Sequence, residues 1–305
     1  MVHVFIINPK YTEKNFATKL RDRLSKIPEL TYYVFTTGAA GDETELARTI
    51  EEIFEGEQYR IYCCGGIQCV RNIINGLRDI SKVEIAVFPT MRIKYLDALG
   101  PQSAFENLED LINGSIKRVD YIKTNHGVAL NVVSFGIDPY IYRVHNNISE
   151  LRIFGKRLPW GIAVVYALLV APNYIYNLEV EGKSKVQKAS HISVSNVLGP
   201  GKDYLDKSEY DVTDGMASYM LAYRFGFISR ILFAVRITKN KIKYTGEGGH
   251  DEKAQITKAK IRHMNGVPIW GNMDGEQVLA TEWKIEVVKQ GLKLVIPAGT
   301  MDERA

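Results

Sequence analysis

The first ninety residues alternate short apolar runs with amphipathic segments, and this alternation constrains the fold more than any other feature of the chain. Val2–Ile7 is a continuous apolar run that ends at Asn8-Pro9, as is typical of a strand buried on both faces. Further strands are predicted at Tyr32–Phe35, Tyr59–Cys64 and Glu84–Phe88, with helices around residues 16–27, 42–54 and 70–77. This order predicts a three-layer α/β domain, with helices on both faces of a parallel sheet.

Ligands of such sheets usually bind beyond the carboxyl ends of the strands. Here these ends are Asn8-Pro9-Lys10, Gly65-Gly66 and Pro89-Thr90-Met91. Glycines let a backbone approach a phosphate closely, and a helix N-terminus offers unpaired N–H donors. A tight strand-to-helix turn explains Gly65-Gly66 equally well. Asp42 is expected to cap the second helix, whose apolar face contains Leu46, Ile50, Ile53 and Phe54.

From about Asn125 the pattern changes to one of alternating residues. Tyr174–Val180 and Trp283–Val287 alternate apolar and polar side chains, which predicts half-buried strands. Further strands are expected at Ile231–Ile237 and Lys258–Met264, and two helices at Tyr140–Arg152 and Trp160–Val170. The second half is therefore predicted to be antiparallel, as a β-sandwich or, alternatively, a barrel. The expected domains are residues 1–123 and 124–290.

The composition narrows the class of protein. Apolar residues make up 46 % and charged residues 24 % of the chain, and the net charge is +4. These values argue against a disordered chain and a dedicated nucleic-acid binder. Three cysteines predict no disulfide framework and a reducing compartment. The longest apolar run, Ile162–Ala171, is shorter than the roughly 20 residues of a spanning helix. We therefore expect a cytoplasmic protein with no transmembrane segment and no nucleic-acid partner.

Two acidic turns are candidate sites. Asp274-Gly275-Glu276 offers a carboxylate base and a second carboxylate, as phosphoryl transfer to a hydroxyl requires. A β-hairpin turn, for which Asp-Gly is a common signal, is the alternative. Asp211–Gly215 contains Asp214, which is a candidate ligand of a hard cation or part of an Asx turn. The sequence contains no Walker A pattern, Rossmann glycine fingerprint or Gly-x-Ser-x-Gly elbow.

A basic cluster precedes the longest apolar run. Arg152, Lys156 and Arg157 stand shortly before Trp160 and the run Ile162–Ala171. Such a segment can lie on an anionic membrane surface. A packed helix with a solvated, charged beginning is the alternative.

The order of short motifs along nearly the whole chain resembles the catalytic domain of diacylglycerol kinases and their sphingosine-kinase and bacterial lipid-kinase relatives. The motifs in the first half are Ile6–Lys10, Gly65-Gly66, Asn72, Asn75-Gly76-Leu77, Phe88-Pro89 and Leu99-Gly100. Those in the second half are Asn131–Asp138, Val194-Ser195-Asn196, Gly199-Pro200-Gly201, Asp214-Gly215, Asp274-Gly275-Glu276 and Leu294–Pro297.

This resemblance implies a lipid kinase that uses ATP and Mg²⁺ on a lipid substrate at a membrane surface, with its active site between the two domains. It implies that Asp274 is the general base and that Glu276 orients or polarises the reacting groups. It also implies that Asp214 belongs to the acidic, metal-linked network that supports the site. The nucleotide-binding residues would be Asn8, Pro9, Lys10, Gly65 and Gly66. Apart from the resemblance, we expect Arg92 and Lys94 to contact phosphates in place of a glycine loop of the family; solvated loop charges are the alternative. It also implies that residues 291–305 return to the first domain.

Three loops depart from the family pattern. The signature Gly-Gly-Asp-Gly-Thr ends here in Ile67-Gln68-Cys69, and Thr90–Tyr95 replaces Gly-Thr-Gly-Asn-Asp. Tyr11-Thr12-Glu13 replaces the glycine turn after Asn-Pro-Lys. The alternative is therefore a catalytically impaired homologue that binds a lipid or a partner. A third possibility is a different phosphate donor or a non-lipid acceptor, because NAD kinases share a similar double-glycine turn. Peripheral membrane association and a homodimer remain open.

Overall fold

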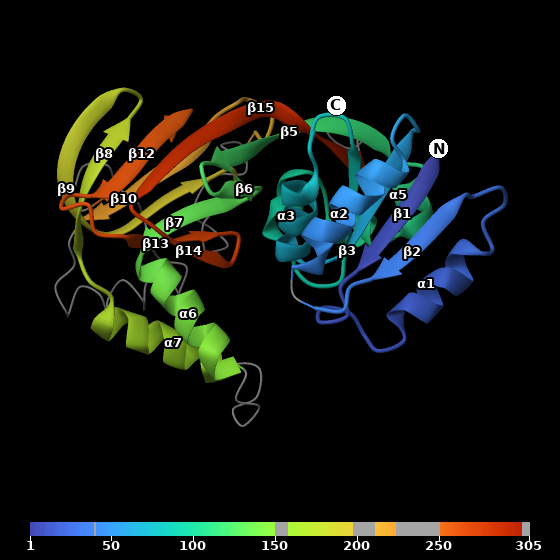
Figure 1. Cartoon of the computed structure of the whole chain (residues 1–305), viewed down its shortest axis with the longest axis horizontal. Coiled ribbons are helices and arrows are strands. Elements are labelled where there is room, and N and C mark those ends of the chain that lie inside the picture. Colours follow the sequence, from blue (N-terminus) through green and yellow to red (C-terminus); the bar gives the residue numbers. More distant parts are fainter. Residues whose placement is uncertain (40, 150–157, 198–210, 224–250, 301–305) are drawn as a thin grey trace. The chain divides into compact units, whose positions relative to one another are not determined.

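The structure is a computed structural model that describes residues 1–39, 41–149, 158–197, 211–223 and 251–300. The chain forms two compact units, Met1–Tyr121 with Lys289–Ala305 and Ile122–Val288 (Figure 1). The proposed domain limits, 1–123 and 124–290, stay a prediction. Several predicted features lie outside the described residues, namely the strand Ile231–Ile237, the motif Gly199-Pro200-Gly201 and the basic residues Arg152, Lys156 and Arg157.

The first unit contains the predicted parallel sheet. Its strands are β1 (Val2–Ile7), β2 (Tyr32–Thr36), β3 (Tyr59–Gly65), β4 (Glu84–Pro89) and the end of β15 (Glu282–Ile296), in the order β15-β4-β3-β1-β2. All four pairings are parallel. Consecutive residues are buried along β1 and β3, so both faces of the sheet are covered. The prediction of an α/β part with a parallel sheet is confirmed.

Short helices connect and cover these strands. They are α1 (Phe16–Leu24), α2 (Asp42–Ile53), α3 (Ile67–Gly76), the 3₁₀ helix η1 (Lys94–Ala98), α4 (Gln102–Phe105) and α5 (Leu108–Ile112). Two details of the prediction for α2 are wrong. Gly41 is the N-cap, and the Asp42 carboxylate instead accepts hydrogen bonds from the amides of Gly38 and Ala39 in the preceding loop. Ile53 is exposed, because it lies at the end of the helix, beyond the packed face.

His3 gives the first unit a pH-dependent stability. Burial, followed by the charge of Arg60, lowers the pKa of His3 from 6.5 to about 4, and its Nδ1 lies 2.7 Å from the Tyr62 hydroxyl. Because the unfolded chain binds this proton at a higher pH, the stabilisation is complete above pH 6.5 and is lost as the pH falls towards 4. We expect the free energy of unfolding to fall by about 2–3 kcal/mol between pH 7 and 4.5.

Urea unfolding of the wild type and of His3→Gln at the two pH values measures this effect. The carboxylates that titrate in the same range are common to both proteins, so the difference between them isolates His3. An equal loss of stability in both proteins would contradict the prediction.

The second unit is built from antiparallel strands. They are β6 (Gly127–Ala129), β7 (Val132–Gly136), β8 (Tyr174–Val180), β9 (Lys183–Ser195), β10 (Ala217–Tyr223), β11 (Asp251–Ile256), β12 (Lys258–His263), β13 (Ile269–Met273), β14 (Glu276–Ala280) and the first half of β15; β5 (Ser115–Thr124) leads into this unit. The strand order is β14-β13-β7-β9-β8-β12-β15, and β10 pairs with both β9 and β11. This confirms the prediction of antiparallel strands in the second half.

The strands of the second unit enclose one core. Trp283 of β15 contacts Phe135 of β7, with ring centroids 5.2 Å apart, although the two strands are not neighbours in the sheet. Trp283, Ile285 and Val287 are all buried, as their alternation predicts. The sheet therefore folds back over its own apolar face, and side chains from both layers fill the space between them.

Among its described residues, the second unit contains the helices α6 (Ile137–Ser149) and α7 (Leu158–Val170). They pack against each other (Figure 1). α6 also contacts β7 and β13. Within the described part of the chain, no helix combines the length and apolar character needed to cross a bilayer.

Candidate functional site

The double-glycine turn lies at the carboxyl edge of the parallel sheet, where β3 ends and α3 begins. Gly66 has an extended backbone, with φ −100°, so its conformation does not require glycine. Close packing requires glycine only at Gly65, where a Cβ would lie 2.9 Å from Cys69 Cβ. A Cβ on Gly66 would lie 2.5 Å from Met91 Sδ, near the end of a flexible side chain. The open faces of both glycines are therefore covered by neighbouring side chains.

A buried polar network lies next to this turn. Asn8, at the end of β1, donates from Nδ2 to Glu43 Oε1, and Asn72 of α3 donates to Glu43 Oε2 over 3.0 Å. Glu43 has no exposed surface. Arg71 donates to Asn72 Oδ1. Glu43 thus ties the carboxyl end of β1 to α2 and α3, a role that the sequence did not reveal because an acidic residue in the first turn of a helix is normally solvated.

The other residues predicted to bind the nucleotide lie around the same edge. Pro9 and Lys10 are exposed, and the Lys10 ammonium lies 5.7 Å from the centre of the Tyr11 ring. Tyr11 donates its hydroxyl to Gln68 Oε1 over 2.5 Å. Burial, followed by the negative charge of Glu43, raises the pKa of Tyr11, so the hydroxyl keeps its proton at neutral pH.

Arg92 and Lys94 follow β4. Arg92 forms a 2.6 Å ion pair with Asp97, and both side chains are largely exposed. Such a pair contributes little stability and is easily exchanged for another anion. Burial lowers the pKa of Lys94. The carboxyl edge thus carries exposed cationic side chains beside a covered glycine turn.

The Asp-Gly-Glu segment lies in the second unit and forms the β13–β14 hairpin turn. Asp274 and Gly275 have φ values of 47° and 97°, as required at the two central positions of a type I′ turn. Asp274 is only 4 % exposed. Its carboxylate accepts hydrogen bonds from three consecutive amides, those of Leu130, Asn131 and Val132, at 2.6–3.2 Å. Glu276 is exposed. The hairpin interpretation is thus correct, and Asp274 also anchors the turn to the β6–β7 connection.

α6 supports the hairpin from one side. Asn146 donates to Gln277 Oε1 over 3.3 Å, and Gln277 donates to the Gly275 carbonyl over 2.6 Å. Burial raises the pKa of Tyr142, and the carboxylates of Asp138 and Asp274 raise it further. Tyr142 also meets Trp160 of α7 edge to face, with centroids 5.5 Å apart. Sequence reasoning missed Tyr142 and Asn146, because only the tertiary fold brings α6 to the hairpin.

The predicted metal ligand Asp214 lies in an Asx-type turn. It is exposed and accepts a 2.7 Å hydrogen bond from the amide of Met216. Among the described residues, no group of three or more His, Cys, Asp and Glu side chains is gathered as a metal site requires.

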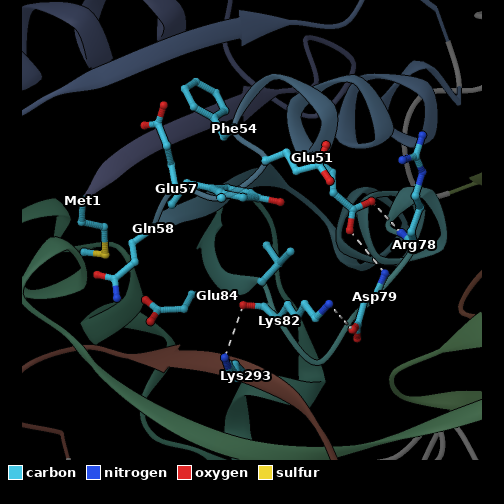
Figure 2. A pocket seen from close by; sticks show the side chains of 14 residues that line it. Met1, Glu51, Phe54, Glu57, Gln58, Arg78, Asp79, Lys82, Glu84 and Lys293 are labelled. Carbon is cyan, nitrogen blue, oxygen red and sulfur yellow. Dashed lines mark hydrogen bonds and ion pairs between the residues drawn. The ribbon is translucent and has the colours of Figure 1, made fainter.

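Two cavities lie away from the predicted site residues. One, of about 590 Å³, lies at the amino edge of the parallel sheet, near Met1, Tyr59 and Glu84 (Figure 2). One of its charged groups already has partners, since Glu51 accepts hydrogen bonds from the backbone amides of Arg78 and Asp79. The other, of about 530 Å³, is lined by charged side chains of β8, β12 and β15. Neither contains a residue of the predicted site.

No protein-family model matches the chain, and no curated protein matches it. Solved structures do match. A "putative diacylglycerol kinase" from Bacillus anthracis strain Sterne superposes with a TM-score of 0.71 at 18 % identity. Two further structures from this strain, described as a diacylglycerol kinase and again as a "putative diacylglycerol kinase", give TM-scores of 0.66 and 0.68 at 16 % and 17 % identity. Each match covers 98 % of both chains. The chain therefore shares the fold of these proteins.

Proposed function

We propose that this chain is a lipid kinase, which transfers the γ-phosphate of ATP to the hydroxyl of diacylglycerol or a related lipid. The observation that carries the proposal is the likeness to diacylglycerol kinase structures over 98 % of both chains. The Asp-Gly-Glu segment supports it, because a lipid hydroxyl needs a carboxylate to accept its proton as the oxygen attacks phosphorus.

On the acceptor side, we assign proton acceptance to Asp274 and orientation of the acceptor to Glu276. The three amides from Leu130 to Val132 hold the Asp274 carboxylate in one orientation. A base that is fixed before substrate binds needs no reorganisation during the reaction. Glu276 is exposed, so its carboxylate is accessible to the polar end of the acceptor.

On the donor side, we assign phosphate contacts to the exposed cations Lys10 and Arg92 and to the backbone of the Gly65-Gly66 turn. Pro9 shapes the loop, and Asn8 fixes it, because its Oδ1 accepts from the amide of Lys10 over 2.9 Å. Mg²⁺ would arrive on the nucleotide phosphates, where it needs only one or two protein carboxylates. We assign no step to the ion.

The experiment that tests this function is transfer of labelled γ-phosphate from ATP to a panel of lipids in detergent micelles containing Mg²⁺. Labelled lipid that depends on the enzyme supports the proposal. The absence of transfer to every lipid of a broad panel refutes it.

A second candidate function is a catalytically impaired homologue that binds a lipid or a partner. The contact of Met91 with Gly66 favours it, because this side chain lies where a nucleotide would approach the turn. Calorimetric titration with ATP and Mg²⁺ separates the candidates. Tight, metal-dependent ATP binding argues for the kinase, whereas no binding and no transfer argue for the binding protein.

We further propose that α7 rests on the membrane that contains the lipid substrate, which makes the protein a peripheral one on the cytoplasmic side. The helix carries no charged residue, and its exposed side chains include Trp160, Val165, Tyr166 and Leu169. An exposed apolar helix face that carries Trp and Tyr suits the interface of a bilayer, where these rings lie at the level of the head groups.

Val165→Asp and Leu169→Asp are each expected to weaken binding to vesicles of phosphatidylcholine and phosphatidylglycerol roughly tenfold, since each exchanges an apolar contact for a buried charge. Sedimentation with the vesicles measures the binding. Val186→Asp, at a residue of β9 with similar exposure, is the matched control and is expected to bind like the wild type. Unchanged vesicle binding, with or without an altered oligomeric state, would contradict this role of α7.

A further inference from the structure

The side chain of Met91 lies against Gly66 of the double-glycine turn. Met91 follows Thr90, whose amide donates to the Gly65 carbonyl over 3.2 Å, and this hydrogen bond holds the segment after β4 against the turn. A Cβ on Gly66 would lie 2.5 Å from Met91 Sδ and 3.2 Å from its Cγ. The thioether therefore occupies the space that the missing side chain of Gly66 leaves open.

This placement opposes phosphate binding. A glycine turn before a helix binds phosphate because bare backbone lets the anion come within hydrogen-bond distance of N–H groups. The apolar thioether offers an anion no donor and takes up space beside Gly66 that an approaching anion would need. The face of Gly65 is also filled, by Cys69, whose Cβ would lie 2.9 Å from a Cβ at that position.

Met91 differs from the other groups around the turn in its freedom to move. It is 47 % exposed, whereas Cys69 is completely buried. The atoms that meet Gly66 are near the end of a flexible side chain. The hydrogen bond from Tyr11 to Gln68 fixes the first turn of α3. Met91 is therefore the part of this surface that can leave without unfolding its surroundings.

We propose that Met91 weakens the binding of nucleoside polyphosphates to this chain by occupying the open face of Gly66. The inference rests on the proposed kinase function. It explains how the turn keeps its two glycines while the loops around it have changed: the glycines now accommodate sulfur-containing side chains.

Met91→Ala and Met91→Leu test the inference by calorimetric titration with Mg²⁺-ATP. Alanine removes the atoms that cover Gly66, and leucine replaces them with apolar groups of similar volume. We expect Met91→Ala to bind ATP roughly tenfold more tightly than the wild type, and Met91→Leu to bind like the wild type. Thermal unfolding of each variant establishes that the compared proteins are folded.

Equal ATP affinity of Met91→Ala and the wild type, or no binding by either, would overturn the inference. A gain of the same size in Met91→Leu would also overturn it, because the covering volume would then be irrelevant. The readout is independent of catalysis. Tighter ATP binding by Met91→Ala without phosphate transfer by any protein would support the role of Met91 and refute the kinase function.

Discussion

Asp274→Ala is expected to lower the free energy of unfolding by about 2–4 kcal/mol and to abolish phosphate transfer to lipid. The loss of stability follows from the amides of Leu130, Asn131 and Val132, which all donate to this carboxylate. Alanine leaves these donors in a buried turn without their acceptor, and each buried, unpaired donor costs free energy. The loss of transfer follows from the proposed role of Asp274 as the base.

Urea unfolding and the transfer assay measure the two effects separately. Glu276→Gln is the matched control, because this side chain is exposed on the same hairpin. It is expected to unfold like the wild type and to transfer phosphate more slowly. If Asp274→Ala unfolds at the wild-type urea concentration, the anchoring role is refuted. If it retains wild-type transfer, the assignment of the base is refuted.

Gly271→Ala is expected to destabilise the second unit by about 3 kcal/mol or more. A Cβ at this position of β13 would lie 2.3 Å from Cζ2 of Trp283 and 2.6 Å from its Cη2. The ring is rigid and fully buried, and it also contacts Phe135 across the core. Accommodating one methyl group therefore requires the indole to move together with the strands around it.

Gly161→Ala is the matched control for this prediction. A Cβ on Gly161 would have no heavy atom within 4 Å, and the residue lies within α7. Alanine there is expected to stabilise by up to about 1 kcal/mol through helix propensity. Thermal and urea unfolding of both variants measure the effect. A fully stable Gly271→Ala protein would contradict the tight packing of Trp283 against β13.

The parts of the fold that depend on local periodicity could be predicted from the sequence. The strand at Val2–Ile7 was predicted with its observed bounds, because a run of apolar residues followed by Asn-Pro marks a buried strand and its end. The Asp-Gly turn was recognisable because positive φ angles at both central positions favour these two residues. The predicted N-cap of α2, Asp42, is wrong by one residue, because the N-cap is Gly41 in a left-handed conformation.

The parts of the candidate site that depend on tertiary contacts could not be predicted. Glu43 looks like a solvated residue of a helical first turn, yet Asn8 and Asn72, which are distant from it in the sequence, enclose it. Met91 looks like one residue of an exposed loop, yet it lies on Gly66. Local sequence patterns indicate how each segment folds. The chemistry at the carboxyl edge of the parallel sheet depends instead on which segments the sheet brings together.

The central claim is that this chain transfers phosphate from ATP to a lipid hydroxyl. The measurement that tests it most directly is the initial rate of labelled lipid formation by the wild type, Met91→Ala, Glu276→Gln and Asp274→Ala in the same micelles. The account predicts transfer by the wild type, faster transfer at limiting ATP by Met91→Ala, slower transfer by Glu276→Gln and none by Asp274→Ala. No labelled lipid from either the wild type or Met91→Ala would contradict it.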